Sequence, residues 1–367
     1  MRLGERDYKV AIYDIETLKP MFDIGVYNPD TKGWVEFEIS RRKNDMYKLM
    51  KYYTSGEFDF WVSFNGLGFD HQVLQYILDN HQEWFDLKGE EIAILISKFA
   101  SSIIENQQYE IPLPYKEYQF PVNVIDVFKI HHFDNKSRRT SLKACEFMMN
   151  MDVEEMPVHH TVDTLTEDEM QLVKDYRRHD VIATLCLLYL TLGQPDDVVS
   201  LLKDVFNLEV NIDELKDYKG KNKIQDRLDL IEGDILPGCL NYSDSKIGDE
   251  LNKLSYCKLS GKKMADLFTL RKSRGRTKRF TYGDAIPTYV TFKTPEFQKL
   301  YDSVKDVKVS LIDKDKQEFP FSYNGTNYLI ARGGIHSGEK NRMIKRAPGM
   351  RLTDADVGLN CGPSKTL

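Results

Sequence analysis

A short apolar segment with two acids, near the start of the chain, constrains the fold most. Residues 9–17 read KVAIYDIET, and their β-branched and aromatic residues are typical of a buried strand. Because side chains alternate between the two faces of a strand, Asp14 and Glu16 project from the same face, about 6–7 Å apart. Two buried carboxylates repel each other unless a cation or a proton lies between them. The alternative is an ordinary strand end with solvated acids, and further acids in the chain decide between the two.

The next segments predict two or three antiparallel strands, then a helix and a parallel strand. Residues 23–27 and 34–39 flank NPDTKG at 28–33, which is typical of a hairpin. Residues 45–53 have helical spacing, and residues 58–64 form a second buried strand. This order resembles the layout of the ribonuclease H-like fold.

A glycine-containing turn, NGLGFD at residues 65–70, follows that strand and opens a helix. Asp70 lies at or just inside the helix start, where exposed amides favour an anion, so it could be a simple N-cap. A cap does not explain Asn65 and Phe69. An amide and an aromatic at these places could hold a phosphate or sugar and a stacked base.

The following segments add a helix at 90–106 and a strand at 122–128, whose Asp126 could point to either face and is expected to be structural. Residues 136–143, KSRRTSLK, then combine four cations with three hydroxyls before a helix that runs through residue 149. A basic loop at a helix N-terminus can hold a phosphate, and a solvated loop is the alternative.

The long helix expected over residues 167–192 supplies a further acid. Tyr176 and Asp180 are four residues apart and therefore lie on one helical face. Asp180 opens an otherwise apolar stretch, so it should lie at the edge of the core. His179 is expected to be a partly exposed helix residue rather than a ligand.

Three motifs thus occur in order: D-x-E on a strand, N-x-x-x-F-D at a turn into a helix, and Y-x-x-x-D on a late helix. Over residues 8–192 they resemble the DEDDy, DnaQ-like class of 3′–5′ exonucleases, with the spacing of the proofreading domain of phage-type family B DNA polymerases. The resemblance implies that Asp14, Glu16, Asp70 and Asp180 bind two Mg²⁺ or Mn²⁺ ions. It also implies that Tyr176 orients the attacking water.

The resemblance further implies residues that hold the terminal nucleotides of DNA. These are Thr17, Leu18, Asn65, Phe69, Ser141, Leu142 and Lys143. The catalytic-lysine motif of the family is not evident at residues 156–161, which read MPVHHT.

The second half of the chain carries two further candidate DNA contacts. A dense basic cluster, which could also be a solvated face, comprises Arg271, Lys272, Arg274, Arg276, Lys278 and Arg279. The segment Ala331, Arg332, Gly333 and Gly334 resembles the Y-x-G-G link between exonuclease and polymerase, with alanine in place of tyrosine. A hairpin is expected at 319–330.

Residues 353–357, TDADV, resemble the start of the first polymerase motif, whose aspartate would be Asp356. The aromatic residue that the family has before Pro-Ser is lacking, and the sequence stops three residues after Ser364. A truncated chain, an interrupted gene or a split polymerase would each give this end.

Length and composition fit about two soluble domains in 367 residues. We expect an α/β, ribonuclease H-like exonuclease domain with a mixed sheet at 1–194, and a smaller α+β, DNA-binding extension leading into a truncated polymerase palm at 195–367. The net charge of −6 means that any basic surface must be local. Five cysteines without a C-x-x-C pair argue against zinc or disulfides and fit a reducing compartment. No apolar run could span a bilayer, so a cytoplasmic protein with no membrane partner is expected.

The expected function is metal-dependent 3′–5′ exonuclease activity on a single-stranded 3′ end or on primer-template DNA. Polymerisation by this chain is not expected, because only one partial polymerase motif is present. The alternatives are a non-catalytic fragment that binds DNA or a separate polymerase chain, and a ribonuclease of the same fold, since the residues do not distinguish ribose from deoxyribose.

Overall fold

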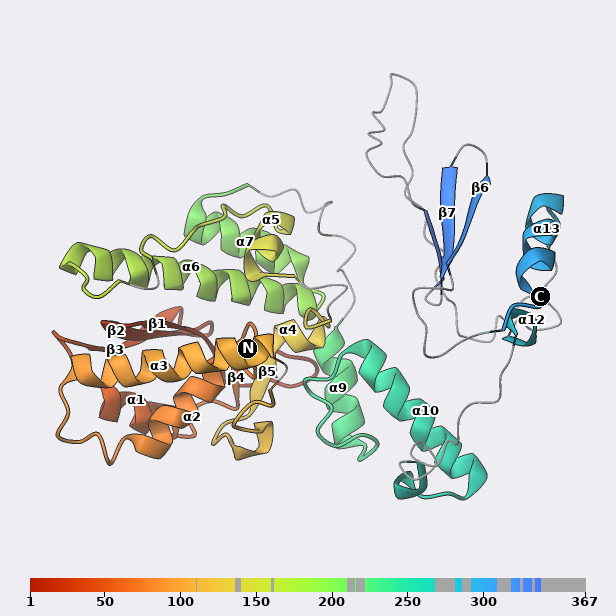
Figure 1. Ribbon diagram of the computed structural model, residues 1–367. Helices are drawn as coiled ribbons and strands as arrows, with labels where there is room; N and C mark the ends of the chain where they lie inside the picture. Colours follow the sequence, from red (N-terminus) through yellow and green to blue (C-terminus); the bar gives the residue numbers. More distant parts are fainter. Residues whose placement is uncertain are drawn as a thin grey trace. The chain divides into compact units, whose positions relative to one another are not determined.

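The computed structural model describes residues 1–109, 111–135, 140–159, 162–209, 215, 222–267, 281–285, 292–308, 318–323, 326–331 and 334–337 (Figure 1). The chain divides into two compact units, residues 1–267 and 268–367. This division lies further along the chain than the boundary expected at residue 194. The functions expected for the parts on either side of that residue stay predictions.

The first unit is an α/β structure around a mixed sheet of five strands. They are β1 (Val10–Leu18), β2 (Met21–Asn28), β3 (Gly33–Ser40), β4 (Phe60–Ser63) and β5 (Val124–Asp126), in the order β3-β2-β1-β4-β5. The pairs β1–β2 and β2–β3 are antiparallel, which confirms the expected meander, and β4 lies parallel to both β1 and β5.

Helices cover both faces of this sheet (Figure 1). One face packs against α1 (Met46–Tyr53), α2 (Asp70–Asn80) and α3 (Gly89–Gln108). The other lies under α6 (Glu167–Thr191), with α5 (Leu142–Met148) and α7 (Pro195–Phe206) packed on that helix. The short helices η1 (Glu117–Gln119) and α4 (Val127–Ile130) flank β5.

Side-chain alternation along β1 decides which face of the sheet carries the acids. Ala11, Tyr13 and Ile15 belong to the hydrophobic cluster under α1 to α3. Val10 and Ile12 belong to the cluster that includes the apolar side of α6. Asp14 and Glu16 continue this second series, so both carboxylates face the layer that holds α6.

The stretch after residue 194 looked polar and less regular in sequence, but the described residues between 195 and 267 include three helices. They are α7, α9 (Lys223–Glu232) and α10 (Asp244–Ser260). Each has a start signal: Pro195 in the first turn of α7, the Asn222 side chain accepting from Gln225 N, and the Ser243 side chain accepting from Lys246 N. Regular structure therefore extends well past the expected boundary.

The described part of the second unit contains two short helices and an antiparallel sheet. They are α12 (Tyr282–Ala285), α13 (Pro295–Val304), and the strands β6 (Phe319–Tyr323), β7 (Thr326–Ala331) and β8 (Gly334–Ser337), in the order β6-β7-β8. Pairing of Tyr323 with Thr326 confirms the expected hairpin, although its two turn residues lie outside the described residues. The basic cluster at 271–279, Arg332, Gly333 and the partial polymerase motif at 353–357 also lie outside them, whereas Gly334 begins β8. Within the described ranges, the helices are all too short or too polar to cross a membrane.

Candidate metal centre

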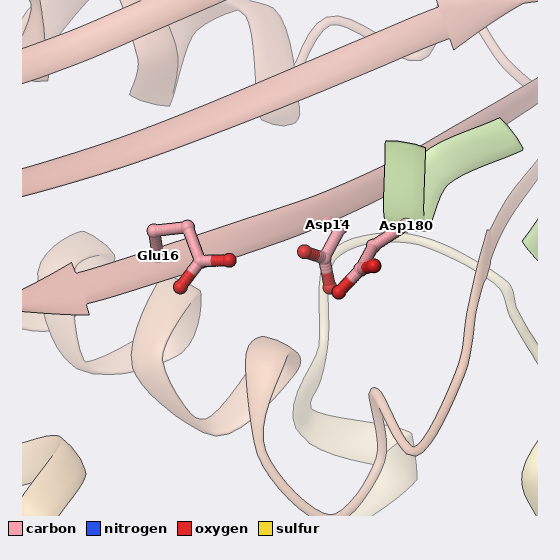
Figure 2. A group of neighbouring side chains, drawn as sticks. All are labelled: Asp14, Glu16 and Asp180. Carbon is pink, nitrogen blue, oxygen red and sulfur yellow. The ribbon is translucent and has the colours of Figure 1, made fainter. Parts of the chain in front are cut away.

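Three acids from two elements meet on the α6 side of the sheet (Figure 2). Asp14 and Glu16 come from β1 and Asp180 from α6, and one ligand oxygen of each lies within 4.8 Å of the others. Figure 2 shows the carboxylates of Asp14 and Asp180 close together, with Glu16 one step further along the strand. All three residues are half-buried. Three converging carboxylates of this kind could hold a metal ion.

Asp70 lines the same cavity from a third element but is not part of that close group. It is the first residue of α2, after Phe69 at the N-cap, and is 3% exposed. The cavity has a volume of about 650 Å³ and is lined by all four acids together with Ile15, Phe64, Asn65, Phe69, Phe128, Thr140, Ser141, Leu142, Lys143 and Tyr176. The turn at 65–70 thus brings a fourth carboxylate to the site.

The electrostatics of the cavity favour a bound cation. Burial, followed by the charge of Asp70, raises the pKa of Asp14 well above its ordinary value, and burial followed by the charge of Asp180 does the same for Glu16. Burial raises the pKa of Asp70 to about 8 and that of Asp180 to about 7. Oδ1 of Asp180 is buried and has no hydrogen-bond partner among the described residues. Because hard oxygen donors are the ligands that Mg²⁺ and Mn²⁺ prefer, this donor set fits such an ion.

Tyr176 and Lys143 lie beside the acids. Tyr176 is one turn before Asp180 on α6, is 9% exposed and has its pKa raised by burial and by the neighbouring charge of Asp180. The Lys143 Nζ lies over its ring, 5.5 Å from the centroid, and pairs with Glu155. A hydroxyl and a cation therefore face the cavity next to the carboxylates.

Asp126 holds the turn at 65–70 in place. Its fully buried carboxylate accepts from Asn65 N at 2.9 Å and Leu67 N at 3.0 Å, and also from Phe128 N at 3.1 Å. The last bond caps α4, which explains why β5 ends at Asp126 rather than continuing to residue 128 as expected. Asn65 has a φ of 64°, a strained conformation that these bonds stabilise. Asp126 has the structural role expected of it.

The other predicted nucleotide contacts divide into two groups. Ser141, Leu142 and Lys143 line the cavity, and the Ser141 Oγ also caps α5 by accepting from Ala144 N. Thr17 and Leu18 are not among the residues that line it. Leu18 is only 3% exposed and packs into a hydrophobic cluster with Met170 and Val173 of α6, and its contact with a nucleotide stays a prediction.

His179 is buried, at 4% exposure, and not partly exposed as expected. Its Nε2 lies 3.8 Å from an Oε of the fully buried Glu146 on α5, and its Nδ1 lies 3.6 Å from Glu154. Phe206 of α7 packs against its ring. The helical pattern around His179 gave no sign of this, because the burial comes from helices that pack on α6 from elsewhere in the sequence.

The sequence did not predict a second group of acids, which lies on the same face of the sheet. Asp23 and Glu36 bind the fully buried guanidinium of Arg177, each at 2.6 Å, and the Lys174 Nζ lies 2.8 Å from Glu38. The alternation of polar residues in the two hairpin strands, read together with the hairpin register, is the signal that could have shown it.

Comparison of the chain with known proteins finds no matching family model, no matching curated protein and no matching solved structure.

Proposed function

We propose that this chain is a metal-dependent 3′–5′ DNA exonuclease of the proofreading type, and that its first part, residues 1–194, is a ribonuclease H-like domain of the phage-type family B DNA polymerases. One observation carries the proposal. Four carboxylates from three separate elements, Asp14, Glu16, Asp70 and Asp180, line a single cavity together with Tyr176. The five-stranded mixed sheet with helices on both faces is compatible with that fold.

The four acids would hold two Mg²⁺ or Mn²⁺ ions, whose four positive charges balance four carboxylates. Such ions, when bound, supply positive charge against the negative charge that develops as a phosphodiester is cleaved. The orphaned, buried Oδ1 of Asp180 and the raised pKa values of Asp70 and Asp180 support this assignment, since each describes a carboxylate that lacks a counterion.

The remaining polar residues of the cavity suit a phosphate and its attacking water. The hydroxyl of Tyr176, next to Asp180, can accept or donate a hydrogen bond and so hold a water in line with the scissile bond. Lys143 brings a positive charge to the same cavity, where a phosphate would enter.

Aromatic side chains on the cavity wall suit an unpaired nucleobase. Phe69 lies at the turn into α2, and Phe64 contacts Phe128 edge-on with ring centroids 5.1 Å apart. Stacking on aromatic rings is a common way to hold single-stranded DNA without regard to sequence. We propose that a single-stranded 3′ end enters here, and that residues 195–367 bind the adjoining primer-template DNA or a separate polymerase chain.

The test is degradation of a 5′-labelled single-stranded DNA in Mg²⁺ or Mn²⁺, beside an RNA of the same sequence. Wild-type protein should shorten the DNA stepwise from its 3′ end, and EDTA or Asp14→Ala should abolish the shortening. Glu83→Gln, which alters an exposed acid away from the cavity, is the control and should retain full activity. Undiminished degradation by Asp14→Ala, or none by the wild type, would refute the proposal, and preferential loss of the RNA would indicate a ribonuclease.

A further inference from the structure

Acids form two rows across the sheet face that carries the candidate metal centre. In the first row, the strand register places Glu16 of β1 opposite Asp23 of β2, and Asp23 opposite Glu38 of β3. Residues paired in this way project from the same face and lie side by side. Lys174 of α6 approaches the two outer acids of this row, at 3.6 Å from Asp23 and 2.8 Å from Glu38. The protein therefore supplies its own cation to the outer part of the row.

The second row has an empty position, and a guanidinium fills it. Asp14 pairs with Gly25, and Gly25 pairs with Glu36. A Cβ atom on Gly25 would lie 1.2 Å from Nη1 of Arg177, so Nη1 occupies the place of the missing side chain. The rest of the guanidinium is fixed, because Nε donates to Asp23 and Nη2 donates to Glu36, both at 2.6 Å.

Nη1 is the nitrogen of the Arg177 guanidinium that makes no hydrogen bond to the described residues. The Arg177 side chain is fully buried. Of its two neighbours in the row, Glu36 is already bonded through Nη2, and the other is Asp14. Paired positions on one face place their Cβ atoms about 4.5–5.5 Å apart, so a carboxylate that extends from Asp14 toward β2 comes within reach of Nη1.

We propose that Arg177 is a positioning residue of the metal centre: when an ion binds, its unpaired Nη1–H donates to the carboxylate of Asp14 and fixes that ligand in place. The inference rests on the proposed metal centre and adds to it a residue that contacts neither ion nor substrate. A buried donor left unpaired destabilises the folded chain, so Nη1 gains from this acceptor. Loss of a residue that orients a metal ligand typically weakens metal binding about 10–100-fold.

Mn²⁺ binding to the EDTA-stripped full chain, with free Mn²⁺ counted by electron paramagnetic resonance, tests this without any nucleic acid. Gly25→Ala displaces Nη1 without removing a charge. Arg177→Lys keeps the charge but has no planar guanidinium to bond Asp23 and Glu36 and still present Nη1 to Asp14. Each should weaken Mn²⁺ binding about 10–100-fold. Gly248→Ala is the matched control, because a Cβ at this position in α10 meets nothing within 4 Å, and it should bind as the wild type does. A folded Gly25→Ala or Arg177→Lys with wild-type Mn²⁺ affinity would overturn the inference, leaving Arg177 a merely stabilising role.

A second measurement on the wild type does not depend on whether the variants fold. In nitrogen-15 spectra of arginine-labelled protein, added Mg²⁺ should shift the Nη signals of Arg177 and slow the exchange of their hydrogens. Arg227, which is equally buried and is bonded to Tyr242 O and Asp244, is the internal control. Unchanged Arg177 signals would overturn the inference.

These outcomes separate the inference from the proposed function. A chain that binds Mn²⁺ and responds as described but leaves DNA intact would refute the nuclease alone. An active nuclease in which Gly25→Ala binds Mn²⁺ normally would refute the inference alone. A wild type that binds no Mn²⁺ would refute both.

Discussion

Replacing Asp126 by asparagine should disturb the turn that brings Asp70 to the candidate metal centre. One carboxylate oxygen of Asp126 accepts from Asn65 N and Phe128 N, and the other accepts from Leu67 N. An asparagine has a single carbonyl oxygen, so whichever way its amide is turned, an NH₂ group faces at least one backbone N–H. The change keeps the size of the side chain and removes only its charge and one acceptor.

The magnitude follows from the burial of this group. A hydrogen bond to a charged partner contributes about 1.5–3 kcal/mol, so losing the bond to Leu67 N should lower the free energy of unfolding by about the same amount. Burial raises the pKa of Asp126 to about 6, so the comparison belongs at pH 7.5, where the native side chain is charged. Because the turn also carries Asn65 and Asp70, a shift of even about 1 Å in its position should lower nuclease turnover about 100-fold.

Urea unfolding followed by circular dichroism measures the first effect, and single-turnover removal of a 3′ nucleotide measures the second. Asp45→Asn is the matched control: Asp45 is 3% exposed, accepts from Glu38 N and is bound by Lys43 and Lys48. It should lower stability and leave turnover unchanged. Wild-type turnover in Asp126→Asn would refute the reasoning that this carboxylate positions the turn.

Three further predictions concern the cavity. Phe69→Ala should raise KM for single-stranded DNA about 5–100-fold, the equivalent of one stacked base, with a smaller change in kcat; equal effects on both would argue against stacking. Tyr176→Phe should lower kcat about 100-fold or more while leaving Mn²⁺ affinity and the unfolding midpoint unchanged, as measured by single-turnover kinetics and titration. In EDTA, the thermal midpoint should fall as pH rises from 5 to 8.5, and Mg²⁺ should restore it at pH 8. The reason is that Asp70 and Asp180, with pKa values of about 8 and 7, keep their protons in the folded chain at pH values where the unfolded chain has released them. The stability that they contribute is therefore full below about pH 4 and is lost as the pH rises through 7 and 8. A flat profile in EDTA would contradict this.

Local spacing was enough to predict the pieces of the site. Strand alternation put Asp14 and Glu16 on one face, helical spacing put Tyr176 beside Asp180, and the strand-to-helix turn fixed the place of Asp70. The structure brings these pieces to one cavity. The meander, the helix at 46–53 and the long helix α6 were predictable for the same reason, since each has a local pattern with a turn or cap at its end.

Features that depend on which elements pack together were not predictable in this way. His179 is buried because α5 and α7 cover α6, and Leu18 is buried because the segment around Leu165 covers the end of β1. Neither neighbour is implied by residues close in sequence. The helices α9 and α10 had visible caps, Asn222 and Ser243, but their polar composition hid them.

On the sheet face that carries the candidate metal centre, acids of the outer half, on β3, and of the inner half, on β1, differ in how their charge is compensated. Although burial alone would raise them, the pKa values of Glu36 and Glu38 are held at about 2, chiefly by hydrogen bonds from Arg178 and Arg42 respectively. On β1, which β2 separates from β3, the pKa values of Asp14 and Glu16 are raised by burial and by other carboxylates. Helix α6 spans both halves, and it supplies arginines to the outer half but an acid to the inner half. Helix α6 thus neutralises the carboxylates of β3 and adds a further carboxylate beside those of β1. This difference supports the proposal that a cation from solution balances the charge of Asp14 and Glu16.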